Sequence, residues 1–270
     1  MSGPHSRHAV RLARMHVPTS SSVRETLARR WLVASELRIL SGRAVEKRRS
    51  EFVAGRLAAK TAVARLRGMR ITRDVVHTLT ANGVNAGQPI AMDASGARMQ
   101  DVYLSITHSG SVAIAAAATT PIGIDLAPVE PRARSFDEDA FLEGELDGWE
   151  RLLGASTAEH VRAVGFAAKE AALKWLGVGL RVGLHDIGVS PIALTNSSPN
   201  ADLGLPTNEL AVRVHVRRQD VPPGALDWSG ELHGLLVDVG PQVLVGFYGA
   251  VGSQIQALSV LSQALVVTPQ

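Results

Sequence analysis

Two lysines and a glutamate lie close together in the segment Phe166-Ala-Ala-Lys-Glu-Ala-Ala-Leu-Lys174. Glu170 and Lys174 are four residues apart, so on the expected helix they share one face, one turn from each other. A carboxylate and an ammonium group held that close on a rigid element can bind a metal ion and a phosphate. The same pattern also fits an ordinary amphipathic helix with a surface ion pair, which stabilises a helix by only about 0.2–0.5 kcal/mol.

Lysine is rare in this chain, which makes the segment more informative. Lysine and arginine together number 28, yet the lysines are only Lys47, Lys60, Lys169 and Lys174. Lysine offers a compact, mobile point charge that arginine does not. The pairing of Lys169 with Lys174 therefore favours a functional role.

A second candidate group is a carboxylate in an apolar strand. The run Val112–Ala118 indicates a buried strand, and Ile122-Gly-Ile-Asp-Leu126 indicates a second short one. A buried carboxylate such as Asp125 must be paired, hydrogen-bonded or bound to a metal. Gly123, two residues earlier, leaves room for a ligand or another backbone to approach closely.

A third segment, Leu104-Ser-Ile-Thr-His-Ser-Gly110, ends another expected strand with an imidazole between two hydroxyl groups. Taken alone, His108 also fits a hydrogen-bonded structural histidine. Upstream, Arg48, Arg49 and Arg56 lie on one expected helix, and Arg49 and Arg56 are seven residues apart and so share a face.

The three segments in this order and spacing resemble the 4′-phosphopantetheinyl transferases, of the larger type that activates surfactin synthetase and siderophore synthetases. The upstream segments Arg48-Arg-Ser-Glu-Phe-Val-Ala-Gly-Arg56 and Gly87-Gln-Pro89 fit the same pattern. The resemblance extends from about residue 9 to residue 250. It implies a holo-[carrier protein] synthase that moves the phosphopantetheine arm of coenzyme A onto a serine of an acyl or peptidyl carrier protein and releases 3′,5′-ADP.

The resemblance also implies residue roles. Asp125 and Glu170 become oxygen ligands for Mg²⁺, which prefers such donors together with phosphate and water. Glu170 and Lys174 are the expected catalytic residues. In related enzymes the counterpart of Glu170 is also proposed as the base for the serine, a role that combines poorly with metal binding. The expected contacts to coenzyme A come from Arg49, Arg56, Thr107, His108, Lys169 and Lys174.

Two positions depart from the family pattern. Ala127 stands where an acidic residue often supplies a further metal ligand, and Gln88 stands where lysine or arginine often contacts a phosphate. These departures favour the alternative of a catalytically impaired module that binds coenzyme A or a carrier protein. A Mg²⁺-dependent transfer assay separates the two.

Composition narrows the class of protein. The chain of 270 residues is 46% hydrophobic and has no cysteine, which excludes disulfides, thiolate nucleophiles and cysteine-bound zinc. No apolar run is long enough for a membrane span. An arginine-rich nucleic-acid-binding protein is a further alternative, but the aromatic fraction is only 4% and no known motif is present. We expect a cytoplasmic monomer whose net charge of +3 suits an acidic carrier.

The expected fold class is α+β, with two pseudo-symmetric halves, each a long helix on a small, mostly antiparallel sheet. The halves are residues 1–119, for the 3′-phosphate and adenine, and 120–252, for the metal and pyrophosphate; the tail 253–270 is unassigned. The duplication is implied by the resemblance, because the sequence shows no residue-level repeat. Residues 1–24 lack acidic groups, as transit peptides do, but residues 9–17 also fit a first strand.

Helices are expected near residues 23–40, 43–67, 137–153 and 156–177, with Ser156 or Thr157 as the N-cap of the last and Gly177 as its stop. Strands are expected near 74–79, 88–92, 101–107, 111–118, 209–218, 231–239 and 242–250. Residues 128–138 are expected to form a polar linker. The segments 197–200 and 222–224 read as loops.

Overall fold

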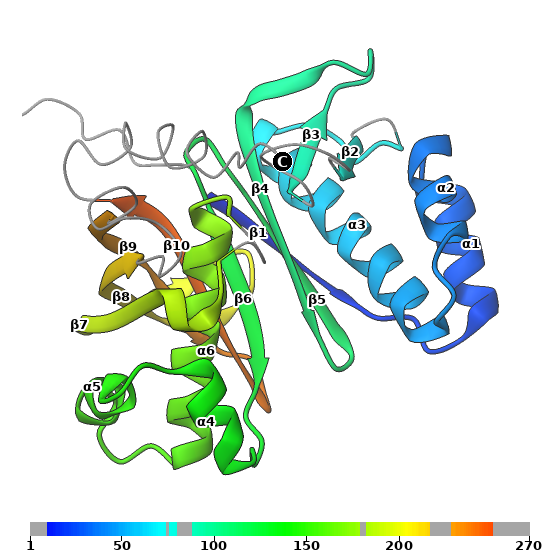
Figure 1. The fold of residues 1–270 in the computed structure, drawn as a ribbon. Helices are drawn as coiled ribbons and strands as arrows, with labels where there is room; N and C mark the ends of the chain where they lie inside the picture. Colours follow the sequence, from blue (N-terminus) through cyan, green and yellow to red (C-terminus); the bar gives the residue numbers. More distant parts are fainter. Residues whose placement is uncertain (1–9, 74–75, 80–87, 179–181, 217–227, 251–270) are drawn as a thin grey trace, which may run out of the picture.

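The computed structural model describes residues 10–73, 76–79, 88–178, 182–216 and 228–250. Residues 1–9, the expected loop at 222–224 and the tail after residue 250 therefore lie outside the described residues. The described part is an α+β fold with two five-stranded antiparallel sheets (Figure 1). The elements of the first sheet and its helices are β1 (Val10–His16), α1 (Ser21–Trp31), α2 (Ala34–Ser41), α3 (Glu46–Arg67), β2 (Val76–Leu79), β3 (Pro89–Met92), β4 (Arg98–Ser109) and β5 (Val112–Ala118). Those of the second are β6 (Gly123–Pro128), α4 (Arg134–Ala140), α5 (Glu145–Leu153), α6 (Ala158–Trp175), a 3-10 turn (Leu184–Asp186), β7 (Ile187–Asn200), β8 (Leu205–Val216), β9 (Trp228–Asp238) and β10 (Gln242–Ala250).

The two halves share one topology. In each, a strand is followed by three helices and then by four strands. The sheet orders are β1-β5-β4-β3-β2 and β6-β10-β9-β8-β7, so every strand of the first half has a counterpart at the same place in the second. The chain changes sheets between Ala118 and Gly123.

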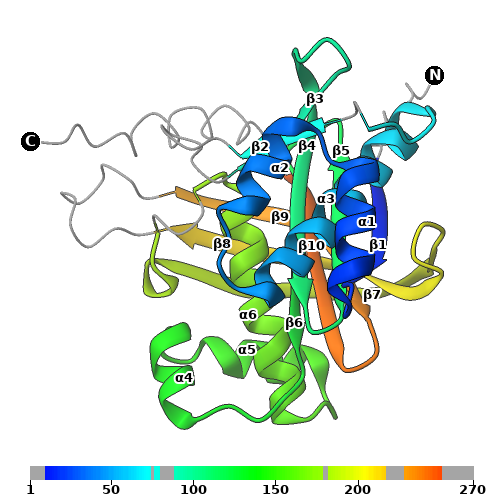
Figure 2. The ribbon, with the colours of Figure 1, turned by 90° about the vertical axis from the view of Figure 1, so that its right-hand side faces the viewer.

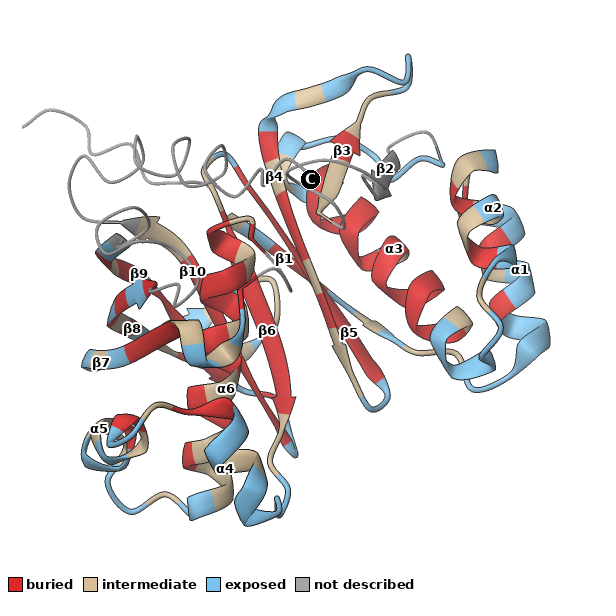
Figure 3. Cartoon of the chain, in the orientation of Figure 1, coloured by how far each residue is buried: buried red, intermediate tan, exposed pale blue. Residues whose placement is uncertain are grey.

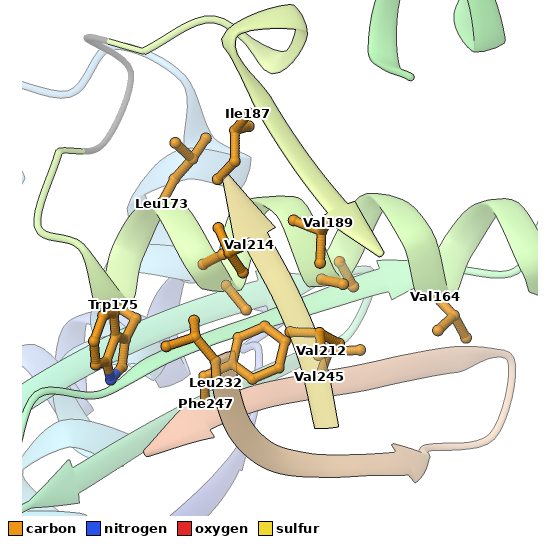
Figure 4. Close-up of a cluster of buried hydrophobic side chains, with 14 of the residues drawn as sticks. Val164, Leu173, Trp175, Ile187, Val189, Val212, Val214, Leu232, Val245 and Phe247 are labelled. Carbon is orange, nitrogen blue, oxygen red and sulfur yellow. The ribbon is translucent and has the colours of Figure 1, made fainter. Parts of the chain in front are cut away.

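The halves are stacked so that the sheets face each other and the long helices lie on the outside (Figures 1 and 2). A core shared by both sheets includes Leu12 and Ile114 from the first and Ile124 and Val237 from the second. The outer face of the first sheet packs on α3. That of the second packs on α6, and Figure 4 shows this core. Buried residues consequently run along the inner faces of both helices and through β5 and β6 (Figure 3).

The structure reveals the residue-level repeat that the sequence alone did not show. Buried Lys60 of α3 forms an ion pair with Glu36 of α2, with 3.1 Å between Nζ and Oε2. Buried Lys169 of α6 forms the matching pair with Glu145 of α5, at 2.6 Å. Both lysines follow an Ala-Ala pair, and the two glutamates are separated along the chain by the same interval as the two lysines. The pseudo-symmetry therefore extends to individual buried charges.

Most expected elements are present, with three corrections. The helix expected at 23–40 is two helices, because Leu32 is extended and the Glu36 side chain accepts a hydrogen bond from the Val33 N–H, which starts a new helix. The linker expected at 128–138 contains the start of α4. Strand β7 was not expected, because its sequence is rich in polar residues and contains Pro191, which an edge strand tolerates. Residues 197–200, which were expected to form a loop, are the end of this strand.

The helix that carries the Lys-Glu-Ala-Ala-Leu-Lys motif begins and ends as expected. The Thr157 hydroxyl caps α6 by accepting a hydrogen bond from the His160 N–H at 3.3 Å. Gly177, just past the end, has a φ of 71°, which only glycine adopts readily. In the described part of the chain, no helix is long and apolar enough to cross a bilayer.

Candidate active site

The site begins where β6 and α6 touch backbone to backbone. A Cβ atom at Gly123 would overlap with the carbonyl oxygen of Ala171 and the backbone nitrogen of Trp175. Only glycine allows this approach. As a result, the Lys174 ammonium group donates hydrogen bonds to the Ile124 carbonyl oxygen, at 3.1 Å, and to Asp125 Oδ1, at 2.6 Å. The close backbone approach expected at Gly123 is made by the motif helix.

Three charged groups meet at this contact. Asp125 is 8% exposed, and its Oδ1 also accepts a hydrogen bond from the Thr107 hydroxyl at 3.0 Å. Burial raises the pKa of Glu170, and the Asp125 charge adds to the rise, while Lys174 opposes it. Two carboxylates thus sit near a single ammonium group, in a place where burial penalises their charge.

These groups line a cleft of about 870 Å³ between the two halves. One wall holds Asp125, Glu170 and Lys174, with Phe166 one turn before Glu170 on α6 and Val178 just past the end of that helix. The other wall comes from the first half, and it includes Gln88, His108 and Arg48. The cleft therefore has an acidic and lysine-bearing side facing a basic side.

A smaller pocket of about 260 Å³ continues the basic side into the first half. Arg48, Pro89, Ile106 and His108 line both spaces. Two guanidinium groups, from Arg43 and Arg56, stack on the Phe52 ring at 4.8 and 4.5 Å from its centroid.

Arg56 is the most unusual group of this pocket. It is 4% exposed, and its Nε and Nη2 atoms have no hydrogen-bond partner within the described ranges. Burial lowers its pKa to about 10. Buried donors without partners are costly, so an anion entering this pocket would relieve both the charge and the unmade hydrogen bonds.

His108 lies between the two spaces. Its Nδ1 is 3.7 Å from the Glu51 carboxylate, which is also 3.2 Å from Arg48. Burial lowers the pKa of His108, the nearby Arg48 and Lys174 lower it further, and Glu51 and Asp125 oppose them. An anion at this point would favour the protonated ring.

Of the other residues expected to contact coenzyme A, Lys169 lies elsewhere. It is fully buried, pairs with Glu145, donates to the Ala140 carbonyl oxygen at 2.7 Å and lies 5.3 Å from the Phe141 ring centroid. Positions 169 and 170 point in different directions from the helix, so Glu170 faces the cleft and Lys169 the core. Lys169 is absent from the cleft wall, and this geometry gives it a structural role.

Thr107 and Arg49 also have other partners. Thr107 hydrogen-bonds to Asp125 and is not among the residues that line either space, whereas His108, on the opposite face of β4, lines both. Arg49 forms an ion pair with Glu46 at 3.0 Å. The preceding residue, Arg48, lines both spaces, and Arg49 lines neither.

The donor set fits a hard divalent cation that is completed by other oxygens. Among the described residues, no group of three or more acidic, histidine or cysteine side chains is placed to hold a metal. Ala127, at the position where a further acidic ligand was considered, is buried in the core. Mg²⁺ is commonly held by one or two carboxylates, with water and substrate phosphate supplying the rest. Burial raises the pKa of Glu170 and the Asp125 charge adds to the rise, and a cation bound here would favour the ionised carboxylate.

The geometry brings two carboxylates, a lysine and several basic side chains to one cleft, and comparison with known families adds a second line of evidence. Residues 121–223 match the family described as the 4′-phosphopantetheinyl transferase superfamily. The match covers less than half of the chain, and it shows that this region is similar to that superfamily. The matched region contains Asp125, Glu170 and Lys174, whereas His108 and the arginines precede it. No curated protein matches the chain significantly.

The structural role of Lys169 predicts a large effect on stability. Lys169→Met leaves Glu145 buried without its cation, so the free energy of unfolding is expected to fall by about 3–5 kcal/mol. Urea denaturation measures this. Lys47→Met is the matched control, because the Lys47 side chain is 73% exposed, and it should change stability by no more than about 0.5 kcal/mol. Equal effects of the two substitutions would contradict the structural role.

The pKa of Glu170 predicts a stability change of the opposite sign. A carboxyl group whose pKa is raised on folding stabilises the fold fully below its unfolded pKa and loses that contribution as pH rises through the folded value. Glu170→Gln keeps the neutral shape. Its melting temperature should therefore exceed that of the wild type at pH 8, with a difference that shrinks towards pH 4.5. A variant that is less stable at every pH would contradict this.

Proposed function

We propose that the protein transfers the 4′-phosphopantetheine group of coenzyme A to a serine of an acyl or peptidyl carrier protein and releases 3′,5′-ADP. The observation that carries this proposal is the pairing, in one continuous cleft, of an Asp-Glu-Lys group with a second, arginine-lined pocket. Coenzyme A has two separate anionic parts, a pyrophosphate and a 3′-phosphate. A cleft with two differently built anion sites suits it better than a single phosphate site would.

We assign the two parts of coenzyme A to the two halves. The first half, residues 1–119, receives the 3′-phosphate at His108, Arg48 and Arg56. The second half, residues 120–252, receives the pyrophosphate at Asp125, Glu170 and Lys174. The apolar lining of the cleft, which includes Phe166 and Val178 on either side of the charged groups, is left for the pantetheine arm.

In the reaction, the serine hydroxyl oxygen attacks the β-phosphorus, and the bond from that phosphorus to the bridging oxygen breaks. Lys174 lies one turn from Glu170, where its charge can stabilise the negative charge that develops on the departing 3′,5′-ADP. Asp125 and Glu170 would hold Mg²⁺, which gathers the pyrophosphate oxygens and neutralises their charge when bound. Because Glu170 is assigned to the metal, the proton of the serine hydroxyl is assigned to water in the cleft.

The test is release of 3′,5′-ADP from coenzyme A, measured by chromatography with purified apo-carrier proteins. Release should need both a carrier and Mg²⁺, and it should stop when EDTA removes the metal. The second candidate, a binding module without catalysis, is favoured by buried Ala127. It predicts that coenzyme A binds but that no 3′,5′-ADP appears with any carrier.

The 3′-phosphate assignment predicts a change in specificity. His108→Ala should raise the KM for coenzyme A by about 10-fold while changing kcat little, because the 3′-phosphate is remote from the bond that breaks. The KM for dephospho-coenzyme A should stay the same. Kinetics with both substrates measure the preference, and a variant that keeps the wild-type preference would remove His108 from the site.

A further inference from the structure

The two halves are joined by side chains along the buried edge of the second sheet. β6 is the edge strand of the second sheet and pairs only with β10, so its outward N–H groups need other partners. The Ile124 N–H donates to Ser105 Oγ and the Leu126 N–H to Thr107 Oγ1, both at 3.0 Å. Ser105 and Thr107 are two apart on β4 and so project from one face. Two hydroxyl groups therefore replace the missing neighbouring strand.

The two hydroxyl groups are not equivalent. A hydroxyl has one hydrogen to donate and two lone pairs that accept. Thr107 accepts from the Leu126 N–H and gives its hydrogen to Asp125 Oδ1 at 3.0 Å. Ser105 accepts from the Ile124 N–H, and no described hydrogen bond links it to a site residue. Only Thr107 connects the joint between the halves to the acidic group of the cleft.

This contact fixes the Asp125 carboxylate. Both described hydrogen bonds to the carboxylate end at Oδ1, one from Thr107 and one from Lys174 at 2.6 Å. Two donors at one oxygen set the orientation of the side chain. They leave Oδ2 as the oxygen available to a ligand in the cleft. Because Asp125 is 8% exposed, it has little room to find another orientation by itself.

We infer that Thr107 is a positioning residue: its hydroxyl orients Asp125 for cation binding while it joins β4 to β6. The catalytic meaning of this role rests on the proposed function. The neighbouring His108 lies on the opposite face of the same strand and lines the basic pocket. β4 thus links the two parts of the cleft: Thr107 contacts Asp125 on the acidic side, and His108 lines the pocket on the basic side.

The experiment compares matched hydroxyl deletions on one strand. The readout is the Kd of Mn²⁺, measured by electron paramagnetic resonance of the free ion, for the full chain in the presence of coenzyme A. Thr107→Val keeps the shape and removes the hydroxyl, and its Kd is expected to rise by about 10-fold or more. Thr107→Ser restores the hydroxyl and should stay within about threefold of the wild type.

Ser105→Ala is the control, because Ser105 also lines the cleft but its described hydrogen bond is to the β6 backbone and not to Asp125. It should lower the melting temperature but leave the Mn²⁺ Kd within about twofold of the wild type. Thr107→Ala, measured in the same way, replaces Thr107→Val if the latter does not fold. Equal Mn²⁺ affinities for the Thr107 hydroxyl deletion and Ser105→Ala would overturn the positioning role.

The outcome for Thr107 can be separated from the outcome for the proposed function. A wild type that binds Mn²⁺ but modifies no carrier would contradict the transferase proposal, and the variants would still decide whether Thr107 orients Asp125. A wild type that modifies carriers, together with a Thr107→Val variant of unchanged Mn²⁺ affinity, would contradict the positioning role alone. A wild type without Mn²⁺ affinity would overturn the positioning role whatever its activity.

Discussion

Glu170→Gln is expected to lower the rate of phosphopantetheine transfer by at least about 100-fold at saturating Mg²⁺ and coenzyme A. The substitution keeps the size of the side chain and removes its charge. With Ala127 buried in the core, Asp125 and Glu170 are the two acidic groups on the cleft wall that we assign to the metal, and the described lining offers no third carboxylate. Initial rates of 3′,5′-ADP release measure the loss.

Glu138→Gln is the control for this experiment, because the Glu138 side chain is 70% exposed and lies on α4, outside the cleft. Its rate should equal that of the wild type. The pH 8 melting temperature of Glu170→Gln should show a folded protein, which separates loss of chemistry from loss of structure. A Glu170→Gln variant with near-normal activity in the presence of Mg²⁺ would overturn the site assignment.

Lys174→Ala is the second large effect, with kcat expected to fall by about 100- to 1,000-fold. The charge of Lys174 is needed most when the bridging oxygen leaves, so kcat should fall at least as much as coenzyme A affinity. Steady-state kinetics give kcat, and calorimetric titration gives the affinity. Lys174→Arg should recover only part of kcat, since the guanidinium group cannot place a point charge in the same position.

Lys47→Ala serves as the control for Lys174→Ala, because Lys47 is largely exposed on α3. It should leave both kcat and coenzyme A affinity unchanged. A Lys174→Ala variant that loses coenzyme A affinity while keeping kcat would show that Lys174 only binds the substrate and does not stabilise the transition state.

The sequence was most informative where a residue type is forced by its surroundings. Asp125 in an apolar strand had to find partners, and it has Thr107 and Lys174. Gly123 had to admit a close neighbour, and it touches α6. The α+β class and the positions of α3 and α6 could be predicted from the spacing of apolar residues, because each buried face repeats an apolar residue with the period of its helix or strand.

Side-chain direction was harder to predict. Thr107 and His108 were both expected to contact coenzyme A, but consecutive residues of a strand face opposite sides, so Thr107 bonds to Asp125 while His108 lines the basic pocket. Lys169 was expected to contact coenzyme A, but a helix turns by about 100° per residue, so Lys169 and its neighbour Glu170 point in different directions.

A signal for the role of Lys169 was nevertheless present in the sequence. Ala58-Ala-Lys60 and Ala167-Ala-Lys169 match, and each lysine has a glutamate partner at the corresponding place, Glu36 or Glu145. The buried lysine–glutamate pair occurs in both halves, whereas Asp125 and Glu170 occur in one half alone. The shared pair is therefore assigned to the fold and not to the chemistry. Thr61 occupies the position after Lys60, where the second half has Glu170. The duplicated residues thus mark structure, and the unmatched ones mark the site.

The measurement that tests the central claim most directly is the intact mass of a carrier protein after incubation. Purified apo-carriers from fatty-acid, polyketide and peptide-synthetase systems are each mixed with the protein, coenzyme A and Mg²⁺, and analysed by mass spectrometry. The claim predicts that at least one carrier gains the mass of a single phosphopantetheine arm, that replacing its acceptor serine by alanine abolishes the gain, and that Glu170→Gln does not produce it. Unchanged carrier masses throughout, with coenzyme A bound to a folded wild-type protein, would contradict the claim.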